Sequence, residues 1–394
     1  MITALINAKL LHAYRDSGTY VGADVDGQVC ADEAYAVIVA GDYIRELVPV
    51  NQLPNDVDRT IDLGGNYLAP GFFDTQVNGG GGVLFNDAPT VETLIAMSEA
   101  HKQFGTSAML PTLISDDLDV MRAAIAAVNS AIEQGVPGIV GIHLEGPFLN
   151  PARKGVHNAN KFKVIDDEAF DILTSLKKGK TLVTLAPEQT DTQTIKRLTD
   201  AGVVVAAGHT AATYEQTCQA LDAGLTSFTH LFNAMTPMSS REPGVVGAAL
   251  QSATSWCGII VDGFHVHPAT LSVAIAAKPK GKVVLVTDAM PTVGAAEKVF
   301  TLNGEVIRAE NGRCATADDT LAGSDLDMLA AVKNTVNMVG IPLEEAVKMA
   351  SQYPADMMGL GECMGRIAPG YRAQFTAFDA DFNLVSIDSL AARN

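Results

Sequence analysis

Four side chains that could bind a metal ion or transfer a proton each stand just past a short apolar run in this sequence. They are Glu145, His209, His230 and Asp288. Glutamate and histidine suit Zn²⁺ or a similar divalent ion, and a free aspartate nearby suits proton transfer. If the apolar runs are parallel strands of a barrel, their ends meet at one rim and bring these positions together. The pattern therefore predicts metal-assisted hydrolysis.

The chain between residues 69 and 360 alternates eight times between a strand-like apolar run and an amphipathic helical stretch. Eight such units over this length favour a (β/α)₈ barrel over an open sheet. The predicted strands are Phe72–Val77, Ser107–Thr112, Gly138–Leu144, Thr181–Ala186, Val203–Ala207, Thr226–Thr229, Cys257–Val261 and Lys282–Val286. Predicted helices include Val91–Phe104, Leu118–Glu133, Glu168–Lys177, Gln193–Ala201, Tyr214–Ala223, Pro268–Ala277, Asp325–Val339 and Leu343–Met358. Several end at the glycine expected of a C-terminal cap, namely Gly105, Gly135, Gly179, Gly202 and Gly224.

The two flanks of this region have a different character. Residues 1–68 contain β-type runs separated by Gly, Asp and Asn, and residues 361–394 continue the same pattern in Gly365–Phe378. We therefore expect one small β-sandwich domain built from both chain termini around a barrel of residues 69–360. The last barrel unit carries an insertion, Glu297–Ala317, with β-like alternation around Asn303 and Gly304.

The composition narrows the possible partners and the compartment. Net charge is 27 − 45 = −18, which argues against nucleic acid because phosphate binding requires clustered Lys and Arg. The longest apolar runs are strand-sized, well short of the roughly 20 residues that span a bilayer, so no membrane partner is expected. The five cysteines are scattered and odd in number, which favours a reducing cytoplasm; they are Cys30, Cys218, Cys257, Cys314 and Cys363.

Polar, ligand-type residues follow six of the eight predicted strands, which scattered core histidines would not produce. The motifs around them resemble, in order and over essentially the whole chain, the amidohydrolase superfamily and within it the N-acetylglucosamine-6-phosphate deacetylase family. The segments that carry the resemblance are Pro70–Gly79, His143–Phe148, Gly155–Asn158, Gly208–Thr210, Thr229–Met235, Val261–His265 and Val286–Met290.

The resemblance implies a role for each rim residue. Glu145, His209 and His230 are expected to bind one divalent metal ion, with Zn²⁺ favoured over Fe²⁺, Mn²⁺ or Co²⁺. Asp288 is expected to be the catalytic acid and base, and His157 to polarise the substrate carbonyl. The implied reaction converts N-acetylglucosamine 6-phosphate to glucosamine 6-phosphate and acetate, in amino-sugar catabolism.

Four further residues are expected, by the same resemblance, to hold the phosphosugar: Asn233, Ala234 through its backbone, Arg241 and His265. The family is dimeric, so a homodimer is expected, with Arg241 acting either in its own site or in that of the neighbouring subunit. Different amidohydrolase substrates, such as another N-acyl sugar, an N-acyl amino acid or a cyclic amide, remain alternatives. A non-catalytic scaffold is disfavoured because the three ligands and the acid/base are all present.

One departure from the wider superfamily concerns the metal count. Many amidohydrolases carry His-x-His after the first strand, where this chain has Gln76 and Asn78. Amide oxygens replace imidazole poorly, so a single-metal site is expected, with Gln76 as an auxiliary contact at most. His143 shares a strand face with Glu145 and is expected to support the ligands rather than to bind the metal itself.

The remaining candidates have ordinary structural explanations. Asp74 is equally consistent with turn chemistry and with a role at the site, and Asp262 could simply cap or pair near the rim. His12 and His101 are expected to be structural or solvated, and His267 to start a helix.

Overall fold

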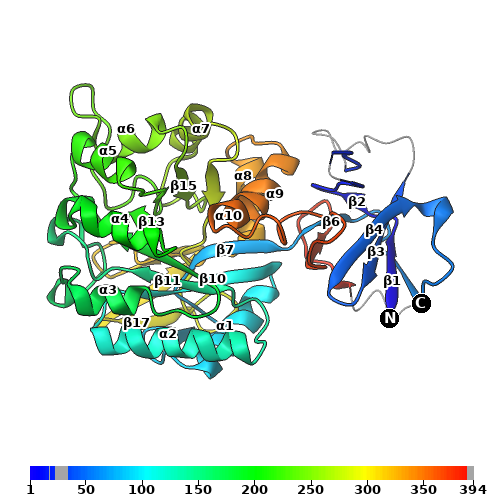
Figure 1. Ribbon diagram of the computed structural model, residues 1–394, viewed down its shortest axis with the longest axis horizontal. Coiled ribbons are helices and arrows are strands. Elements are labelled where there is room, and N and C mark those ends of the chain that lie inside the picture. The colour runs from blue at the N-terminus through cyan, green and yellow to red at the C-terminus, as the bar shows by residue number, and fades with distance from the viewer. Residues whose placement is uncertain (17, 23–33, 388–394) are drawn as a thin grey trace.

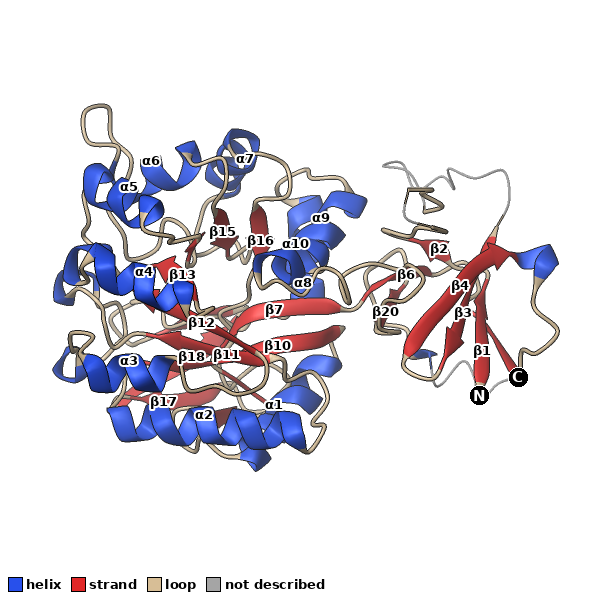
Figure 2. Cartoon of the chain, viewed as in Figure 1, coloured by secondary structure: helices blue, strands red, loops and turns tan. Residues whose placement is uncertain are grey.

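The computed structural model describes residues 1–16, 18–22 and 34–387, which form a large barrel domain and a smaller β domain (Figures 1 and 2). The barrel contains the chain from β7 to α10, whereas β1 and the last strand, β20, both belong to the small domain. No helix within the described residues is both long enough and apolar enough to span a membrane.

Eight parallel strands form the barrel sheet, in the order β16-β15-β14-β13-β12-β11-β10-β7. A parallel bridge between Val77 and Ala289 joins the first strand to the segment after the last. The strands are β7 (Phe72–Val77), β10 (Thr106–Ile114), β11 (Gly141–Glu145), β12 (Lys180–Leu185), β13 (Val204–Ala207), β14 (Ser227–Phe228), β15 (Trp256–Ile259) and β16 (Val283–Leu285). The predicted (β/α)₈ barrel is confirmed, and the largest shift of a strand end is from Gly138 to Gly141.

Helices surround the barrel and share one hydrophobic core with its strands. They are α1 (Val91–Lys102), α2 (Leu118–Glu133), α3 (Asp167–Leu173), α4 (Thr192–Asp200), α5 (Tyr214–Asp222), α6 (Gly244–Gln251), α7 (Pro268–Ala277), α8 (Met328–Asn337), α9 (Leu343–Ala350) and α10 (Gln352–Met357). Four of the predicted cap glycines, Gly105, Gly135, Gly202 and Gly224, follow a helix end with φ between +72° and +109°, the left-handed conformation that ends a helix. Gly179 is also left-handed, but the cap predicted there is wrong, because α3 already ends at Leu173. Helix α6 was not predicted, because its sequence is apolar nearly throughout and the residue before it, Pro243, has no side chain that can cap the helix.

The insertion in the last barrel unit forms an antiparallel meander of β17 (Val299–Leu302), β18 (Glu305–Glu310) and β19 (Arg313–Ala315). Asn303 and Gly304 connect the first two strands with φ of +51° and +84°, the left-handed pair of a tight hairpin. Ile307 of this meander packs with Ile114, the last residue of β10, and with Met290, which follows β16. The insertion therefore covers the barrel rim at which the candidate site residues gather.

The small domain contains two sheets. One has the order β4-β3-β1-β5, from β1 (Ile2–Ile6), β3 (Tyr35–Ala40), β4 (Tyr43–Pro49) and β5 (Arg59–Asp62). The other has the order β2-β6-β20, from β2 (Lys9–Leu10), β6 (Tyr67–Pro70) and β20 (Phe375–Phe378). Because β20 pairs with β6, both ends of the chain contribute to this domain, as predicted.

Candidate metal centre and active site

The four residues that first indicated chemistry lie together at the carboxyl ends of the barrel strands. Glu145 ends β11, His209 and His230 follow β13 and β14, and Asp288 follows β16. Their exposed fractions are only 2%, 5%, 5% and 8% respectively. The parallel sheet therefore brings these four side chains, which are far apart in the sequence, together in one buried site.

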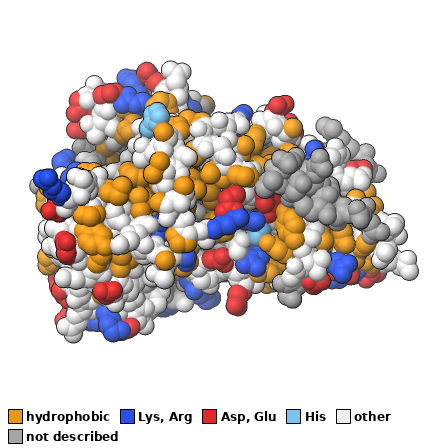
Figure 3. All heavy atoms as spheres, turned by 90° about the horizontal axis from the view of Figure 1, so that it is seen from above, with side chains coloured by type: hydrophobic (Ala, Val, Ile, Leu, Met, Phe, Trp, Pro, Cys, Tyr) orange, Lys and Arg blue, Asp and Glu red, His pale blue; other side chains and the backbone are white. Residues whose placement is uncertain are grey.

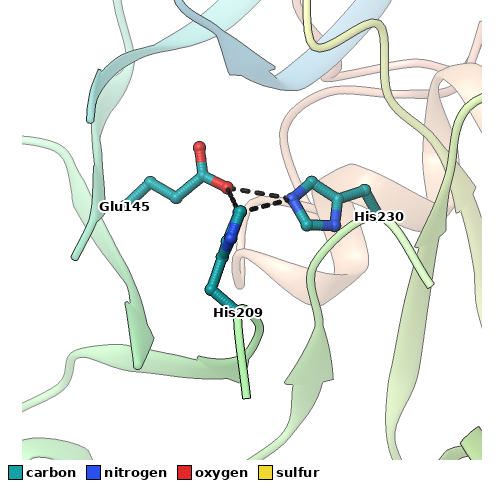
Figure 4. Close-up of side chains that lie close together, drawn as sticks. All are labelled: Glu145, His209 and His230. Carbon is teal, nitrogen blue, oxygen red and sulfur yellow. Dashed lines mark hydrogen bonds and ion pairs between the residues drawn. The ribbon is translucent and has the colours of Figure 1, made fainter. Parts of the chain in front are cut away.

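Glu145, His209 and His230 point toward one another with their polar atoms converging (Figure 4). Glu145 Oε1 lies 3.2 Å from His209 Nε2 and 3.0 Å from His230 Nε2, and the two imidazole nitrogens are 3.1 Å apart. The Nδ1 atom of His209 donates to the carbonyl oxygen of Arg153 at 2.9 Å, which leaves Nε2 with its lone pair. A backbone carbonyl in this position is the usual means of orienting a histidine ligand.

This donor set fits a divalent cation. Two imidazole nitrogens and a carboxylate oxygen are the ligands that zinc prefers, and tetrahedral bonds of about 2.0–2.1 Å separate ligand atoms by roughly 3.3–3.4 Å. The observed separations of 3.0–3.2 Å are close to that spacing. Burial opposes ionisation of Glu145, yet its hydrogen bonds with His209 and His230 hold its pKa well below the ordinary value. The carboxylate is thus available as an anionic ligand.

Asp288 lies beside these three residues, with amide donors on its carboxylate. Its Oδ1 accepts from Asn78 Nδ2 at 2.6 Å and from Gln76 Nε2 at 3.2 Å. The same Gln76 nitrogen lies 3.3 Å from each carboxylate oxygen of Glu145. Burial, followed by the charge of Glu145, raises the pKa of Asp288, which suits a group that must accept a proton and return it.

His157 is a hydrogen-bond donor aimed into the site. Its Nδ1 accepts from the backbone N–H of Ser115 at 3.3 Å and lies 2.8 Å from the hydroxyl of the same residue. Burial and the neighbouring His209 lower its pKa to about 3, so the ring is neutral. With Nδ1 acting as acceptor, the ring proton resides on Nε2, where it can be donated to a substrate oxygen.

His143 does not join the candidate metal ligands. Its Nδ1 is 3.2 Å from the hydroxyl of Thr112, and its Nε2 is 2.7 Å from that of Thr184. Burial lowers its pKa to about 4, so it is a neutral ring held between β10 and β12. This arrangement agrees with a supporting position beneath the ligands.

The site opens into a cavity of about 280 Å³. Of the residues expected to hold a sugar phosphate, Asn233, Ala234 and His265 line it. The His265 Nδ1 donates to Asp262 at 2.6 Å, which fixes the orientation of the ring. Arg241, in contrast, is exposed in the loop before α6 and is not among the described residues that line the cavity.

The backbone around the site is unusual. His209, His230 and Asp288 all have positive φ, at +48°, +29° and +55°, as do Phe232 and Ala234. Non-glycine residues rarely adopt this conformation, and it persists where the surrounding structure holds it in place. The chain therefore turns sharply just after β13, β14 and β16, at the residues His209, His230 and Asp288.

Comparison with known proteins agrees with this geometry. The sequence model of the amidohydrolase family matches residues 67–392. The chain belongs to the amidohydrolase family. Members of this family depend on a metal ion, and the buried glutamate–histidine cluster is the corresponding feature of this chain.

Individual amidohydrolases are similar over most of the chain. The N-acetylgalactosamine-6-phosphate deacetylase of Shewanella sp. strain ANA-3 is 44% identical, covering 81% of each protein. The N-acetylglucosamine-6-phosphate deacetylase of Haemophilus influenzae is 38% identical, covering 89% of this chain and 92% of the other. The crystal structure of N-acetylglucosamine-6-phosphate deacetylase from Pasteurella multocida superimposes with a TM-score of 0.89 at 36% identity, covering 98% and 97% of the two chains.

Several contacts at this amidohydrolase site were not predicted. Gln76 presents its amide nitrogen to two carboxylates, so in this arrangement it bridges Glu145 and Asp288 rather than offering an oxygen to a metal. Asn78 and Ser115 were not expected to contact Asp288 and His157. No sequence motif marks these contacts, because each depends on the packing of neighbouring strand ends.

The remaining polar candidates lie outside the ligand cluster and have structural contacts of their own. Asp74 is fully buried and accepts from the hydroxyl and the backbone N–H of Thr287, which ties β7 to the residue before Asp288. His12 and His101 are buried and remote from the ligand cluster, and His267 caps the start of α7.

Metal content provides the first test of this site. We expect about one tightly bound divalent ion per chain, because the amides Gln76 and Asn78 stand where a second ion would need histidines. His209→Asn and Glu145→Gln should each release the ion while the barrel stays folded, as measured by elemental analysis and circular dichroism. His267→Asn is the matched control, since asparagine also caps helices, and it should retain the ion. Two stoichiometric ions, or full occupancy in His209→Asn, would contradict the assignment.

Proposed function

We propose that this protein hydrolyses the acetamide of N-acetylglucosamine 6-phosphate to give glucosamine 6-phosphate and acetate, in amino-sugar catabolism. The observation that carries the proposal is the cavity in which Asp288 and His157 face the Glu145–His209–His230 cluster. The similarity to deacetylases of N-acetylhexosamine 6-phosphates, over most of the chain, supports the same reaction type.

A second candidate substrate is N-acetylgalactosamine 6-phosphate. A relative named for that sugar is 44% identical, compared with 38% for the Haemophilus influenzae enzyme named for the glucosamine form. The two sugars differ only in the configuration at C4, so both present the same acetamide and the same phosphate to the site. The catalytic residues cannot distinguish them, and any preference must come from the part of the cavity that contacts the C4 hydroxyl.

The proposed chemistry follows from the positions of the side chains. A divalent ion, for which we propose Zn²⁺, when bound supplies a Lewis acid that polarises the amide and favours ionisation of water. Asp288 accepts the proton of the attacking water, and the Nε2–H of His157 donates to the acetamide oxygen as negative charge develops there. As the C–N bond breaks, Asp288 returns the proton to the departing amine, which would otherwise be too basic to leave.

Because the chain has a net charge of −18, it can bind a phosphate only where positively charged groups or hydrogen-bond donors are gathered. We propose that His265, held by Asp262, and the backbone turn at Asn233 and Ala234 contact the phosphosugar from within the cavity. Arg241 lies on an exposed loop outside the cavity of its own chain. We therefore propose that it serves the site of a neighbouring subunit.

A homodimer is consistent with the surface that carries this loop. Helix α7 has no charged residue along its length, although its outer residue Val273 is 64% exposed. Met238, in the Arg241 loop, is 57% exposed. Figure 3 views this side of the molecule and shows hydrophobic side chains spread across it. An apolar surface of this kind favours contact with another protein surface.

We also propose that the protein works in a reducing compartment such as the cytoplasm. The four cysteines among the described residues are free, and burial raises the pKa of Cys257 and of Cys314 to about 12. Such thiols are protonated and unreactive, so oxidation has no evident role.

Acetate release from four sugars tests the substrate proposal: N-acetylglucosamine and N-acetylgalactosamine, each with and without the 6-phosphate. We expect N-acetylglucosamine 6-phosphate to give the highest kcat/KM, and removal of the phosphate to lower it strongly. A higher value for N-acetylgalactosamine 6-phosphate would favour the second candidate. Equal kcat/KM values with and without the 6-phosphate would contradict both candidate substrates.

Substitution of Asp288 by asparagine tests its role in proton transfer. The change keeps the shape but removes the base, so turnover should fall by about 10²–10⁴-fold while metal and substrate still bind. The wild-type kcat/KM should decline as pH falls and protonates Asp288, and the midpoint should lie above the ordinary aspartate value because burial raises this pKa. Any residual activity of Asp288→Asn should lack that decline. Near-normal turnover would move the acid/base role to another residue, with His143 or His157 the next candidates.

Arg241→Ala tests phosphate selectivity and the shared site together. The change removes a positive charge that would attract the phosphate. It should therefore raise KM for the phosphosugar much more than KM for unphosphorylated N-acetylglucosamine, which has no phosphate. Mixing Arg241→Ala chains with Asp288→Asn chains should restore activity, since one site of each hybrid dimer then has both groups. Equal effects on both substrates would make Arg241 structural, and mixtures without recovery would count against a shared site.

A further inference from the structure

Strand β12 lies between β11, which ends in Glu145, and β13, which precedes His209. No residue at the end of β12 belongs to the candidate ligand cluster among the described residues. The strand leads instead into a short 3₁₀ turn, η4 (Pro187–Gln189), that presents the half-buried side chain of Glu188. The proposed reaction gives this glutamate no role, although it lies directly beside the loops that hold the site.

The carboxylate of Glu188 accepts hydrogen bonds from both neighbouring loops. Its Oε1 accepts from Asn150 Nδ2 at 2.8 Å and from the backbone N–H of Ala211 at 2.5 Å. Its Oε2 accepts from the hydroxyl of Thr210. Asn150 belongs to the loop after β11, whereas Thr210 and Ala211 directly follow His209. Glu188 thus joins the loops that flank the candidate metal centre.

These loops orient the His209 ring and its backbone. The backbone N–H of Asn150 donates to the His209 carbonyl at 3.0 Å. The Asn150 side chain also caps the 3₁₀ turn η2 (Pro151–Arg153), and Arg153 at the end of that turn accepts from His209 Nδ1 at 2.9 Å. A continuous chain of contacts therefore leads from Glu188 through Asn150 and Arg153 to the imidazole.

The backbone of His209 needs such support. Its φ of +48° lies in the left-handed region that residues with a side chain avoid unless the surrounding structure enforces it. Without the carboxylate, three donors around it would lose their acceptor, and the loop after His209 would be held less firmly.

We propose that Glu188 is a positioning residue for the metal centre: it clamps the loops after β11 and β13 and thereby holds His209 in its ligating orientation. It contacts neither the ligand atoms nor the substrate cavity. The inference rests on the proposed metal centre but not on the identity of the substrate. Partners that orient a ligand in this way typically change metal affinity by about 10–100-fold when they are removed.

The test measures Zn²⁺ affinity of metal-free protein by competition with a chromophoric chelator, so no substrate is needed. Glu188→Ala should weaken Zn²⁺ binding by about 10–100-fold. Glu188→Gln should lose much less, because the amide oxygen still accepts from Asn150 and Ala211 while Thr210 can reverse its hydroxyl. With saturating Zn²⁺, KM for the phosphosugar should be unchanged in both variants. Glu168→Ala is the control, since Glu168 forms an exposed ion pair with Arg122 and is not among the described residues of the candidate metal cluster.

The outcomes separate this inference from the proposed function. Zinc affinity of Glu188→Ala within twofold of wild type, or no weaker than that of Glu168→Ala, would overturn the positioning role alone. A wild-type protein that binds no zinc would overturn both the role and the metal centre. If Glu188→Ala does not fold, Asn150→Ala decides, because it removes the side-chain link yet keeps the backbone bond to His209. Unchanged zinc affinity in that variant would also overturn the role.

Discussion

Two buried carboxylates, Glu145 and Asp288, lie within reach of a single glutamine nitrogen, and the rest of the site is arranged around their charge. Burying an anion is costly unless hydrogen bonds or a counter-charge compensate it, and burying two together costs more. The amides of Gln76 and Asn78 supply donors but no charge. A divalent cation bound at Glu145 would supply positive charge, so the burial of two carboxylates side by side favours metal binding. The same balance explains the pKa values of the two acids. Despite its burial, hydrogen bonds with His209 and His230 lower the pKa of Glu145. Burial and the nearby charge of Glu145 raise the pKa of Asp288.

The barrel makes this concentration of charge possible. Parallel strands bring residues that are far apart in sequence to one rim, and a left-handed residue at several strand ends turns the side chains inward. Around that rim part of the support comes from neutral groups with fixed hydrogen bonds: His143 between two threonines, His157 on Ser115, and the backbone carbonyl of Arg153 on His209. These groups orient the site residues without adding charge, whereas the carboxylates of Asp262 and Glu188 lie one step farther out, on His265 and on the loops around His209.

Much of this arrangement could be predicted from the sequence, because its signals are local. Apolar runs and cap glycines indicated the strands and most helices, and the polar residues after six of the eight runs indicated the rim. Helix α6 was missed because an apolar helix without a capping side chain carries no periodic signal. At the site, the replacement of histidine by Gln76 predicted that a second metal is absent, but not that the amide nitrogen faces two carboxylates. Asp74, Asn78 and Glu188 could not be assigned, since each contacts a residue from a different strand end or loop.

We propose that Glu145, His209 and His230 hold a single ion while Asp288 stays free to transfer protons. Crystals of the zinc-loaded protein, measured on both sides of the zinc absorption edge, test it most directly. We expect one anomalous peak per chain, within bonding distance of these three side chains and farther from the oxygens of Asp288. A peak coordinated by Asp288 in place of one of the three, or a second peak beside Gln76 and Asn78, would contradict it.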